Sequence, residues 1–235
     1  MLSLTRLNNG KPEIFRSIQG EGVNSGITAS FLRLAFCNLK CSWCDTRYSW
    51  DWQHYDQNTE VIKMNSTDVA EHIRALGTKH LIVTGGEPLI QQKDLCELLA
   101  SLKREKYYVE VETNGTISPT DEIIPLVDQW NVSPKLENSG TLSSIREIPD
   151  AYRMFASLQS SYFKYVIQSE NDLKEVHSLV HKYRVSPARV LLMPEGTDRD
   201  TILTRGRWLA GLGNNQGYRL TTRLHVLLWG NSRGR

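Results

Sequence analysis

The chain has 235 residues, of which 40% are hydrophobic and 23% are charged, and its formal net charge is +2. This length suits one α/β domain, and the hydrophobic share allows a sizeable core. The small net charge and the dispersed basic residues argue against a nucleic-acid-binding surface. The N-terminus has no signal-peptide pattern and no apolar run reaches membrane-spanning length, so we expect a cytoplasmic protein with no membrane partner.

The first predicted strand covers residues 12–18 and ends in Gln19-Gly20-Glu21-Gly22. Glycines on either side of a carboxylate allow the backbone to approach a ligand, so Gln19 and Glu21 are candidate binding residues. An ordinary turn explains these glycines equally well.

A second strand is predicted at residues 30–36, where Arg33 interrupts an apolar run. An arginine in such a strand either extends to the edge of the sheet or points into a cavity, where it can hold a carboxylate in a bidentate grip. Its place four residues before Cys37 favours the cavity.

Three of the four cysteines, Cys37, Cys41 and Cys44, lie within eight residues. A Cys-x3-Cys-x2-Cys loop can place three thiolates at three corners of a 4Fe-4S cluster, where a ferredoxin supplies four ligands. The open iron can then chelate S-adenosylmethionine. The alternative is a zinc site, but it lacks a second Cys-x2-Cys pair, and Cys96 lies in a helical pattern as a core thiol.

This spacing, with the aromatic Trp43 just before the third cysteine, resembles the cluster loop of the radical S-adenosylmethionine superfamily. The segment that follows, residues 47–65, contains Tyr48, Trp50 and Trp52 among polar residues and predicts a long variable excursion. Such a segment forms a lid, or its aromatic residues anchor it to the body of the protein, and we favour the anchor.

The rest of the chain repeats an apolar strand, a polar segment and an amphipathic helix. Asp68 and Glu71 resemble a capping box that opens the first of these helices. With residues 30–36, six parallel strands are predicted, and the other five cover residues 80–84, 107–111, 129–132, 163–167 and 190–193.

Polar segments follow the carboxyl ends of these strands, the face where active sites of parallel barrels assemble. Six strands are too few to close a barrel. We therefore predict an open, partial (β/α) barrel of about six mainly parallel strands, formed by a single domain over residues 1–235. A doubly wound sheet is the alternative, although no phosphate-binding glycine motif follows the first strand.

Several motifs together resemble the 7-carboxy-7-deazaguanine synthase family over essentially the whole chain. They are Phe15–Gly22, Phe31–Arg33, Cys44–Thr46, Thr84–Pro88, Val111–Gly115 and Arg223–His225. The resemblance implies a carbon-nitrogen lyase that converts 6-carboxy-tetrahydropterin to 7-carboxy-7-deazaguanine in queuosine and related deazapurine biosynthesis. It also implies a 4Fe-4S cluster, S-adenosylmethionine and Mg2+ as cofactors, a reductant such as flavodoxin or ferredoxin, and a homodimer.

The same resemblance assigns roles to residues. The cofactor set is Trp43, Cys44, Asp45, Gly86, Glu87, Ser133, Pro134, Lys135, Met193, Pro194 and Glu195. The substrate set is Ile18, Gln19, Gly20, Glu21, Arg33, Thr84 and His225. Thr46 is the expected Mg2+ ligand, and a lone hydroxyl would bind that ion weakly without substrate.

Two other functions stay open from the residues alone. A glycyl-radical enzyme activase shares the cysteine spacing but acts on a large protein, and an iron-sulfur or zinc module would have no turnover. Some relatives end in a proline whose carboxylate helps to bind substrate, whereas this chain continues to Asn231-Ser232-Arg233-Gly234-Arg235. The sequence therefore gives no support for direct binding of substrate by the C-terminal carboxylate.

Overall fold

The computed structural model describes residues 1–212 and 217–235. One mixed sheet forms its centre, in the order β10-β9-β8-β7-β6-β5-β3-β1-β4, with β2 also paired to β3. The strands are β1 (Leu2–Thr5), β2 (Ile14–Ile18), β3 (Thr28–Leu34), β4 (Val61–Met64), β5 (His80–Gly85), β6 (Tyr108–Thr113), β7 (Gln129–Val132), β8 (Ser161–Ile167), β9 (Val190–Pro194) and β10 (Arg219–Leu220).

Strands β3 and β5 to β10 run parallel to one another, whereas β1 and β2 pair antiparallel with β3, and β4 pairs antiparallel with β1. The six predicted parallel strands are thus confirmed, with boundaries that differ by about two residues. No pairing joins β10 to β2 or β4 within the described chain. The sheet is therefore an open partial barrel, as predicted.

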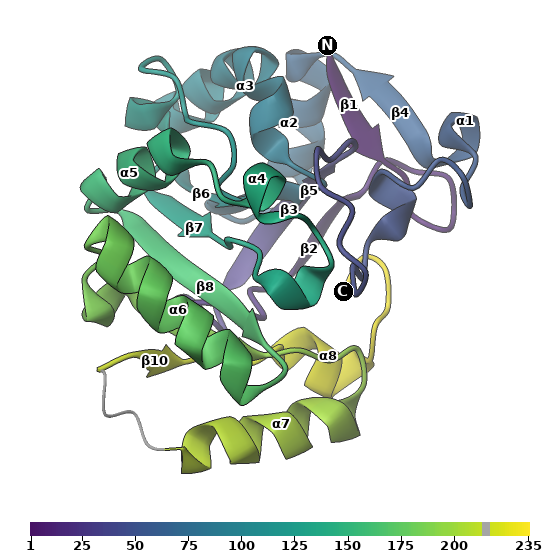
Figure 1. Cartoon of the computed structure of the whole chain (residues 1–235). Helices are drawn as coiled ribbons and strands as arrows, with labels where there is room; N and C mark the ends of the chain where they lie inside the picture. Colours follow the sequence, from purple (N-terminus) through teal and green to yellow (C-terminus); the bar gives the residue numbers. More distant parts are fainter. Residues whose placement is uncertain (213–216) are drawn as a thin grey trace.

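Helices wrap the outside of this sheet (Figure 1). They are α1 (Gln57–Glu60), α2 (Ser66–Ala75), α3 (Gln92–Arg104), α4 (Ser143–Arg146), α5 (Pro149–Ser157), α6 (Glu170–Tyr183), α7 (Arg199–Gly211) and α8 (Leu224–Trp229). The prediction for the start of α2 was wrong. Its N-cap is Asn65, whose side chain accepts from the backbone N–H of Asp68, so Asp68 lies in the first turn instead of capping it.

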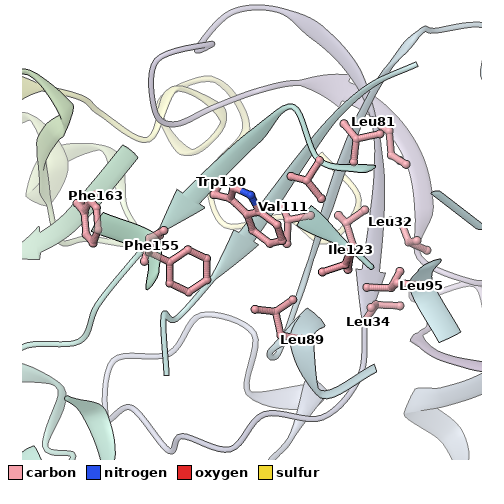
Figure 2. Packing of buried hydrophobic residues seen from close by; sticks show 14 of the residues in the cluster. Leu32, Leu34, Leu81, Leu89, Leu95, Val111, Ile123, Trp130, Phe155 and Phe163 are labelled. Atoms are coloured by element: carbon pink, nitrogen blue, oxygen red, sulfur yellow. The ribbon is translucent and has the colours of Figure 1, made fainter. Parts of the chain in front are cut away.

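The core lies between the helices and the outer face of the sheet (Figure 2). In α3 the stripe of Leu95, Leu98, Leu99 and Leu102 is fully buried, and burial of each such side chain contributes about 1.5–3 kcal/mol. Trp130 of β7 packs edge-on against Phe155 of α5, with ring centroids 5.6 Å apart. These contacts hold the parallel strands at fixed positions.

Strand side chains alternate between two faces, so the inner face of the sheet can carry charged groups, beside a small apolar cluster of Phe15, Ala29, Phe31 and Ile82. In β6, Val109 and Val111 enter the core, while Glu112 lines a cavity on the other side. In β8, Phe163 packs in the core and Lys164 lines the same cavity. The period of two therefore places charged groups inside the barrel without disturbing the core.

The predicted excursion is only partly irregular. Residues 61–64 form β4, which pairs with β1 at the edge of the sheet, and Arg47–Ser49 form a short 3-10 helix, η1. Tyr48 is buried, and Trp52 packs edge-on against Phe36, 5.9 Å between centroids. These contacts support the anchoring interpretation of the aromatic residues. Across the described residues, every helix is too short or too polar to span a membrane.

Candidate active site

A cavity of about 650 Å3 opens at the carboxyl ends of the parallel strands. Its wall includes all three cysteines of the predicted cluster loop and every residue of the predicted substrate set. From the predicted cofactor set it includes Trp43, Cys44, Asp45, Gly86, Ser133, Lys135, Met193 and Glu195. Glu87, Pro134 and Pro194 do not line the cavity and instead neighbour residues that do.

The cluster loop is fixed at both ends by contacts outside itself. Phe36, which has a left-handed φ of 75°, donates its backbone N–H to Ser49 O at 2.7 Å and accepts from Glu87 N at 2.8 Å. Farther along, Ser42 N donates to Ser139 O at 2.9 Å. The loop is thus held between η1, the Gly-Gly-Glu-Pro segment and the loop after β7.

The cysteine thiols are free and have polar neighbours. Leu39 N donates to Cys37 Sγ at 3.4 Å, and the Trp50 indole N–H donates to Cys44 Sγ at 3.3 Å. Burial raises the pKa of the Cys37 thiol to about 12, with the Leu39 N–H partly opposing the shift, and burial also raises the pKa of Cys41. The thiolates therefore need a cationic partner, which the irons of a cluster supply.

The Gly-Gly-Glu-Pro segment, residues 85–88, packs closely against the start of the cluster loop. A Cβ atom on Gly86 would clash with the carbonyl group of Phe36, so only glycine permits this close approach. Glu87 is fully buried, and it accepts from Thr113 Oγ1 at 2.8 Å and from Asn114 N at 2.7 Å. Its carboxylate therefore joins β5 to β6, and its contribution to the cavity is through backbone position.

Lys135 and Glu195 line the cofactor side of the cavity, and each has a partner that holds it in place. The Lys135 ammonium lies 5.5 Å from the centre of the Trp43 ring and donates to Ser133 Oγ at 3.0 Å. Arg205 of α7 donates to the carbonyl oxygen of Glu195 at 2.8 Å and pairs with its carboxylate. The loops after β7 and β9 thus present residues of the predicted cofactor set from fixed positions.

A hydrogen-bonded group of polar side chains forms another part of the cavity wall. The Gln19 amide donates to Glu112 Oε1 at 3.2 Å, and Thr84 Oγ1 donates to Glu112 Oε2 at 2.8 Å. Gln19 Oε1 accepts from Glu21 N at 3.3 Å. Glu112 therefore connects two predicted substrate residues, although the sequence reasoning assigned it no role.

Arg33 is held by a buried carboxylate that the sequence reasoning also missed. Its Nε donates to Glu13 Oε1 at 2.9 Å, and Glu13 also accepts from Tyr48 OH at 3.1 Å and from Thr5 Oγ1 at 2.8 Å. Burial acts to lower the pKa of Arg33, but Tyr48 and Glu13 raise it above its usual value. Within the described chain, the terminal guanidinium nitrogens form no hydrogen bond with protein atoms, which suits them to a ligand.

Charged side chains from four segments meet beside the cluster loop. Glu21 accepts from Lys164 of β8 and, at 3.0 Å, from Arg223, which also pairs with Asp45. Burial acts to raise the pKa of Glu21, but the Lys164 and Arg223 cations hold it well below its usual range. Burial lowers the pKa of His225, which lies against Gly20.

Residues 231–235, to which the sequence assigned no role, also line the cavity. Arg233 donates to Glu60 Oε2 at 2.9 Å, and its guanidinium lies 3.4 Å from the centre of the Tyr48 ring. The C-terminal segment is thus bound by two residues of the 47–65 excursion, close to which the C-terminus lies in Figure 1. Tyr48 and Trp50 of the excursion and the C-terminal segment therefore line the cavity together.

Comparison with known proteins agrees with this arrangement. The family model of the radical SAM superfamily matches residues 32–133. A 7-carboxy-7-deazaguanine synthase from Pyrobaculum aerophilum is 39% identical over 226 residues, which cover 95% of this chain and 96% of that protein. The chain belongs to the 7-carboxy-7-deazaguanine synthase family. A second member, from Halobacterium salinarum, is 33% identical and covers 92% of this chain and 89% of its own.

A solved structure also has this fold. "Crystal structure of QueE from Escherichia coli" superposes with a TM-score of 0.70, at 23% identity, over 95% of this chain and 94% of that one. The radical SAM superfamily model implies a 4Fe-4S cluster and S-adenosylmethionine for this member of the synthase family. Three free thiols on one loop that borders a polar cavity fit these groups.

The zinc alternative does not fit the geometry. In residues 1–212 and 217–235, no three Cys, His, Asp or Glu side chains lie close enough together to bind one ion. A structural zinc site needs four ligands on one ion, whereas thiolates at cluster corners each bind a separate iron. Cys96, the remaining cysteine, packs against the core from α3. His177 and His181 lie on α6 and do not line the cavity.

Proposed function

We propose that this chain is a radical enzyme that converts 6-carboxy-tetrahydropterin to 7-carboxy-7-deazaguanine, with loss of ammonia, in deazapurine biosynthesis. The observation that carries this proposal is near-full-length similarity to 7-carboxy-7-deazaguanine synthases, together with three thiols that face a polar pocket. The bound cluster and S-adenosylmethionine supply a hydrogen-abstracting radical. The protein binds and orients the substrate and excludes side reactions.

The polar wall of the cavity accounts for recognition of the pterin. Arg33 binds the substrate carboxylate through its terminal N–H groups, because Glu13 already occupies Nε. Gln19, Thr84 and Glu112 present hydrogen-bonding groups to the polar pyrimidine edge. His225, with its lowered pKa, is neutral near pH 7 and offers one donor and one acceptor.

Cysteines 37, 41 and 44 hold the cluster in this proposal. S-adenosylmethionine lies against Trp43, Lys135 and the backbone at Gly86, all of which border the cavity beside the thiols. Glu87, Pro134 and Pro194 act by fixing the backbone of the neighbouring residues. Asp45, Ser133, Met193 and Glu195 complete that wall.

Mg2+ binds at Thr46 in the presence of substrate. Thr46 lines the cavity as the N-cap residue of η1, but its hydroxyl makes no capping hydrogen bond and contacts Cys44 Sγ at 3.6 Å, so its oxygen can still accept a ligand. A neutral hydroxyl is a weak ligand, and the substrate carboxylate and waters are needed to complete octahedral coordination. Metal and substrate therefore bind cooperatively.

Replacement of Thr46 with valine tests this role. Thr46→Val removes one oxygen with little change in volume, and we expect half-saturation by Mg2+ to require roughly tenfold more metal. Iron content should stay the same, and excess Mg2+ should restore part of the activity because water can replace one ligand. Turnover is measured against Mg2+ concentration at saturating S-adenosylmethionine. Superimposable curves for the two proteins would show that Thr46 is a structural loop residue.

The remaining assignments are also proposals. The enzyme works in the cytoplasm as a homodimer and receives its electron from a small carrier such as flavodoxin or ferredoxin. Thiols crowded in one loop of a chain that is not rich in cysteine fit a reducing compartment.

A binding test with 6-carboxy-tetrahydropterin distinguishes the proposed synthase from a glycyl-radical enzyme activase. A glycyl-radical enzyme activase docks a loop of a large protein and has no need for the Arg33, Gln19 and Glu112 arrangement. The protein reconstituted with its cluster, but not reduced, should bind 6-carboxy-tetrahydropterin in a calorimetric titration. The same pterin without the carboxylate should bind at least tenfold more weakly, since it loses the charged contact to Arg33. Absence of binding by both pterins would favour the activase.

A further inference from the structure

Arg223 makes three hydrogen bonds in three directions. Its Nε donates to Glu21 Oε1 at 3.0 Å, its Nη1 donates to the carbonyl oxygen of Gly196 at 2.7 Å, and its Nη2 donates to Asp45 Oδ2. The residue is 8% exposed and lies directly before α8. One guanidinium thus joins segments that are far apart in the sequence.

Each of those segments belongs to a different part of the active site. Glu21 lies in the turn that faces the pterin, next to Gln19. Asp45 follows the cluster ligand Cys44, and Gly196 follows Glu195 of the cofactor wall. The substrate side and the cofactor side therefore meet at a single side chain.

We propose that Arg223 is a positioning residue that couples the binding of S-adenosylmethionine to the binding of the pterin. This inference rests on the proposed function, because it needs both ligands in the cavity. A ligand that binds against the cluster loop restrains Asp45 further, and through Arg223 it also restrains Glu21. The second ligand then meets a wall that is already ordered and binds more tightly.

The contacts of the neighbouring residues show why Arg223 carries the coupling. Lys164 also pairs with Glu21, but it reaches no atom of the cluster loop. If Arg223 is removed, Glu21 keeps a cationic partner and the turn keeps its charge balance, whereas the link to Asp45 is lost. A lysine has a single ammonium and cannot reproduce the planar fork that serves three acceptors.

Arg146 provides a matched control. It is also 8% exposed, and its guanidinium also bonds to three groups, but it does not line the cavity. Its partners are Thr141 O at 3.0 Å, Lys135 O at 3.1 Å and Glu175 Oε1 at 2.5 Å. Arg146→Met should cost stability as Arg223→Met does, without breaking the link between the two ligand sites.

The test uses cluster-loaded, unreduced enzyme, so that no turnover occurs. The Kd of S-adenosylmethionine is measured by calorimetry with and without saturating 6-carboxy-tetrahydropterin, for the unchanged protein, Arg223→Met, Arg223→Lys and Arg146→Met. Iron content and Tm are recorded for each. We expect the pterin to tighten binding about tenfold in the unchanged protein and in Arg146→Met, within the roughly 5–150-fold range of coupled sites. This coupling factor is the Kd of S-adenosylmethionine without the pterin divided by its Kd with the pterin. It should fall to about one in Arg223→Met and below half of its original value in Arg223→Lys.

The outcomes separate this inference from the proposed function. A coupling factor that stays near ten in Arg223→Met overturns the inference and leaves the proposed function intact. A coupling factor near one in the unchanged protein has the same meaning. Failure of the unchanged protein to bind the pterin at all overturns the proposed function instead. If Arg223→Met does not fold, Arg223→Lys decides the question, since it keeps the charge and an undiminished factor in that variant would contradict the coupling.

Discussion

Alanine at Cys37, Cys41 or Cys44 is expected to abolish reductive cleavage of S-adenosylmethionine. All three thiols lie on one loop and border the cavity, and each is assigned one iron of the cluster. Loss of one of three protein ligands should leave a cluster that is bound incompletely or not at all, so iron per chain should fall together with formation of 5′-deoxyadenosine. Iron analysis and visible absorption after anaerobic reconstitution measure the first effect, and chromatography measures the second.

Cys96 provides the control for these variants. It is the fourth free cysteine, and it packs on α3 against the core, away from the cluster loop. Cys96→Ala should keep full iron content and full cleavage activity, with a small loss of stability from the lost packing. Complete loss of the cluster in Cys96→Ala would contradict a site with three protein ligands.

The second large effect is expected at Arg33. Arg33→Lys keeps a positive charge but loses the forked geometry that can hold both oxygens of a carboxylate. We expect kcat/KM for 6-carboxy-tetrahydropterin to fall by about 100-fold, which corresponds to about 2.7 kcal/mol and lies within the range for hydrogen bonds to charged groups. Most of the loss should be in KM. Iron content and the Kd of S-adenosylmethionine should change little.

The fold should survive this replacement because Glu13 retains its bonds to Tyr48 and Thr5. Arg16→Lys provides a matched control, since Arg16 is an exposed arginine on the neighbouring strand β2. Steady-state kinetics on the two variants separate a local effect from a general one. Equal kcat/KM values for Arg33→Lys and the unchanged enzyme would remove Arg33 from carboxylate binding.

The sequence predicted the parallel part of the fold because apolar runs and polar segments alternate there. Strands in which nearly every residue is buried give strong apolar patterns, as in His80–Gly85 and Ser161–Ile167. It did not predict β1, β4 or β10. Each has four residues or fewer, and β4 lies within a polar excursion, so no periodic pattern could emerge.

The site residues that the sequence did not predict were missed for a different reason. Glu13, Glu112 and Lys164 face the inside of the barrel, but in a strand the sequence gives the same alternation for a solvent-exposed charge. Only the register of the sheet tells the two apart. Buried charges need partners, so the inward position of Arg33 was itself a signal that a carboxylate such as Glu13 lies near.

The contact between the 47–65 excursion and the C-terminal segment is visible only in the structure. Glu60 and Tyr48 bind Arg233 across a separation of more than 170 residues, which no local pattern predicts. Arg223 likewise joins Glu21 to Asp45 although the chain separates them widely. Contacts of this kind depend on how the curved sheet brings distant segments together, so the motifs predicted the chemistry but not the contacts between them.

Product analysis tests the central claim most directly. The protein is reconstituted anaerobically with iron and sulfide and supplied with S-adenosylmethionine, Mg2+, a strong reductant and 6-carboxy-tetrahydropterin. Mass spectrometry should then show 7-carboxy-7-deazaguanine, with ammonia released in equal amount and no product from Cys44→Ala. Formation of 5′-deoxyadenosine without any deazapurine, by a protein with a full cluster, would contradict the assignment of this cavity to the carboxypterin.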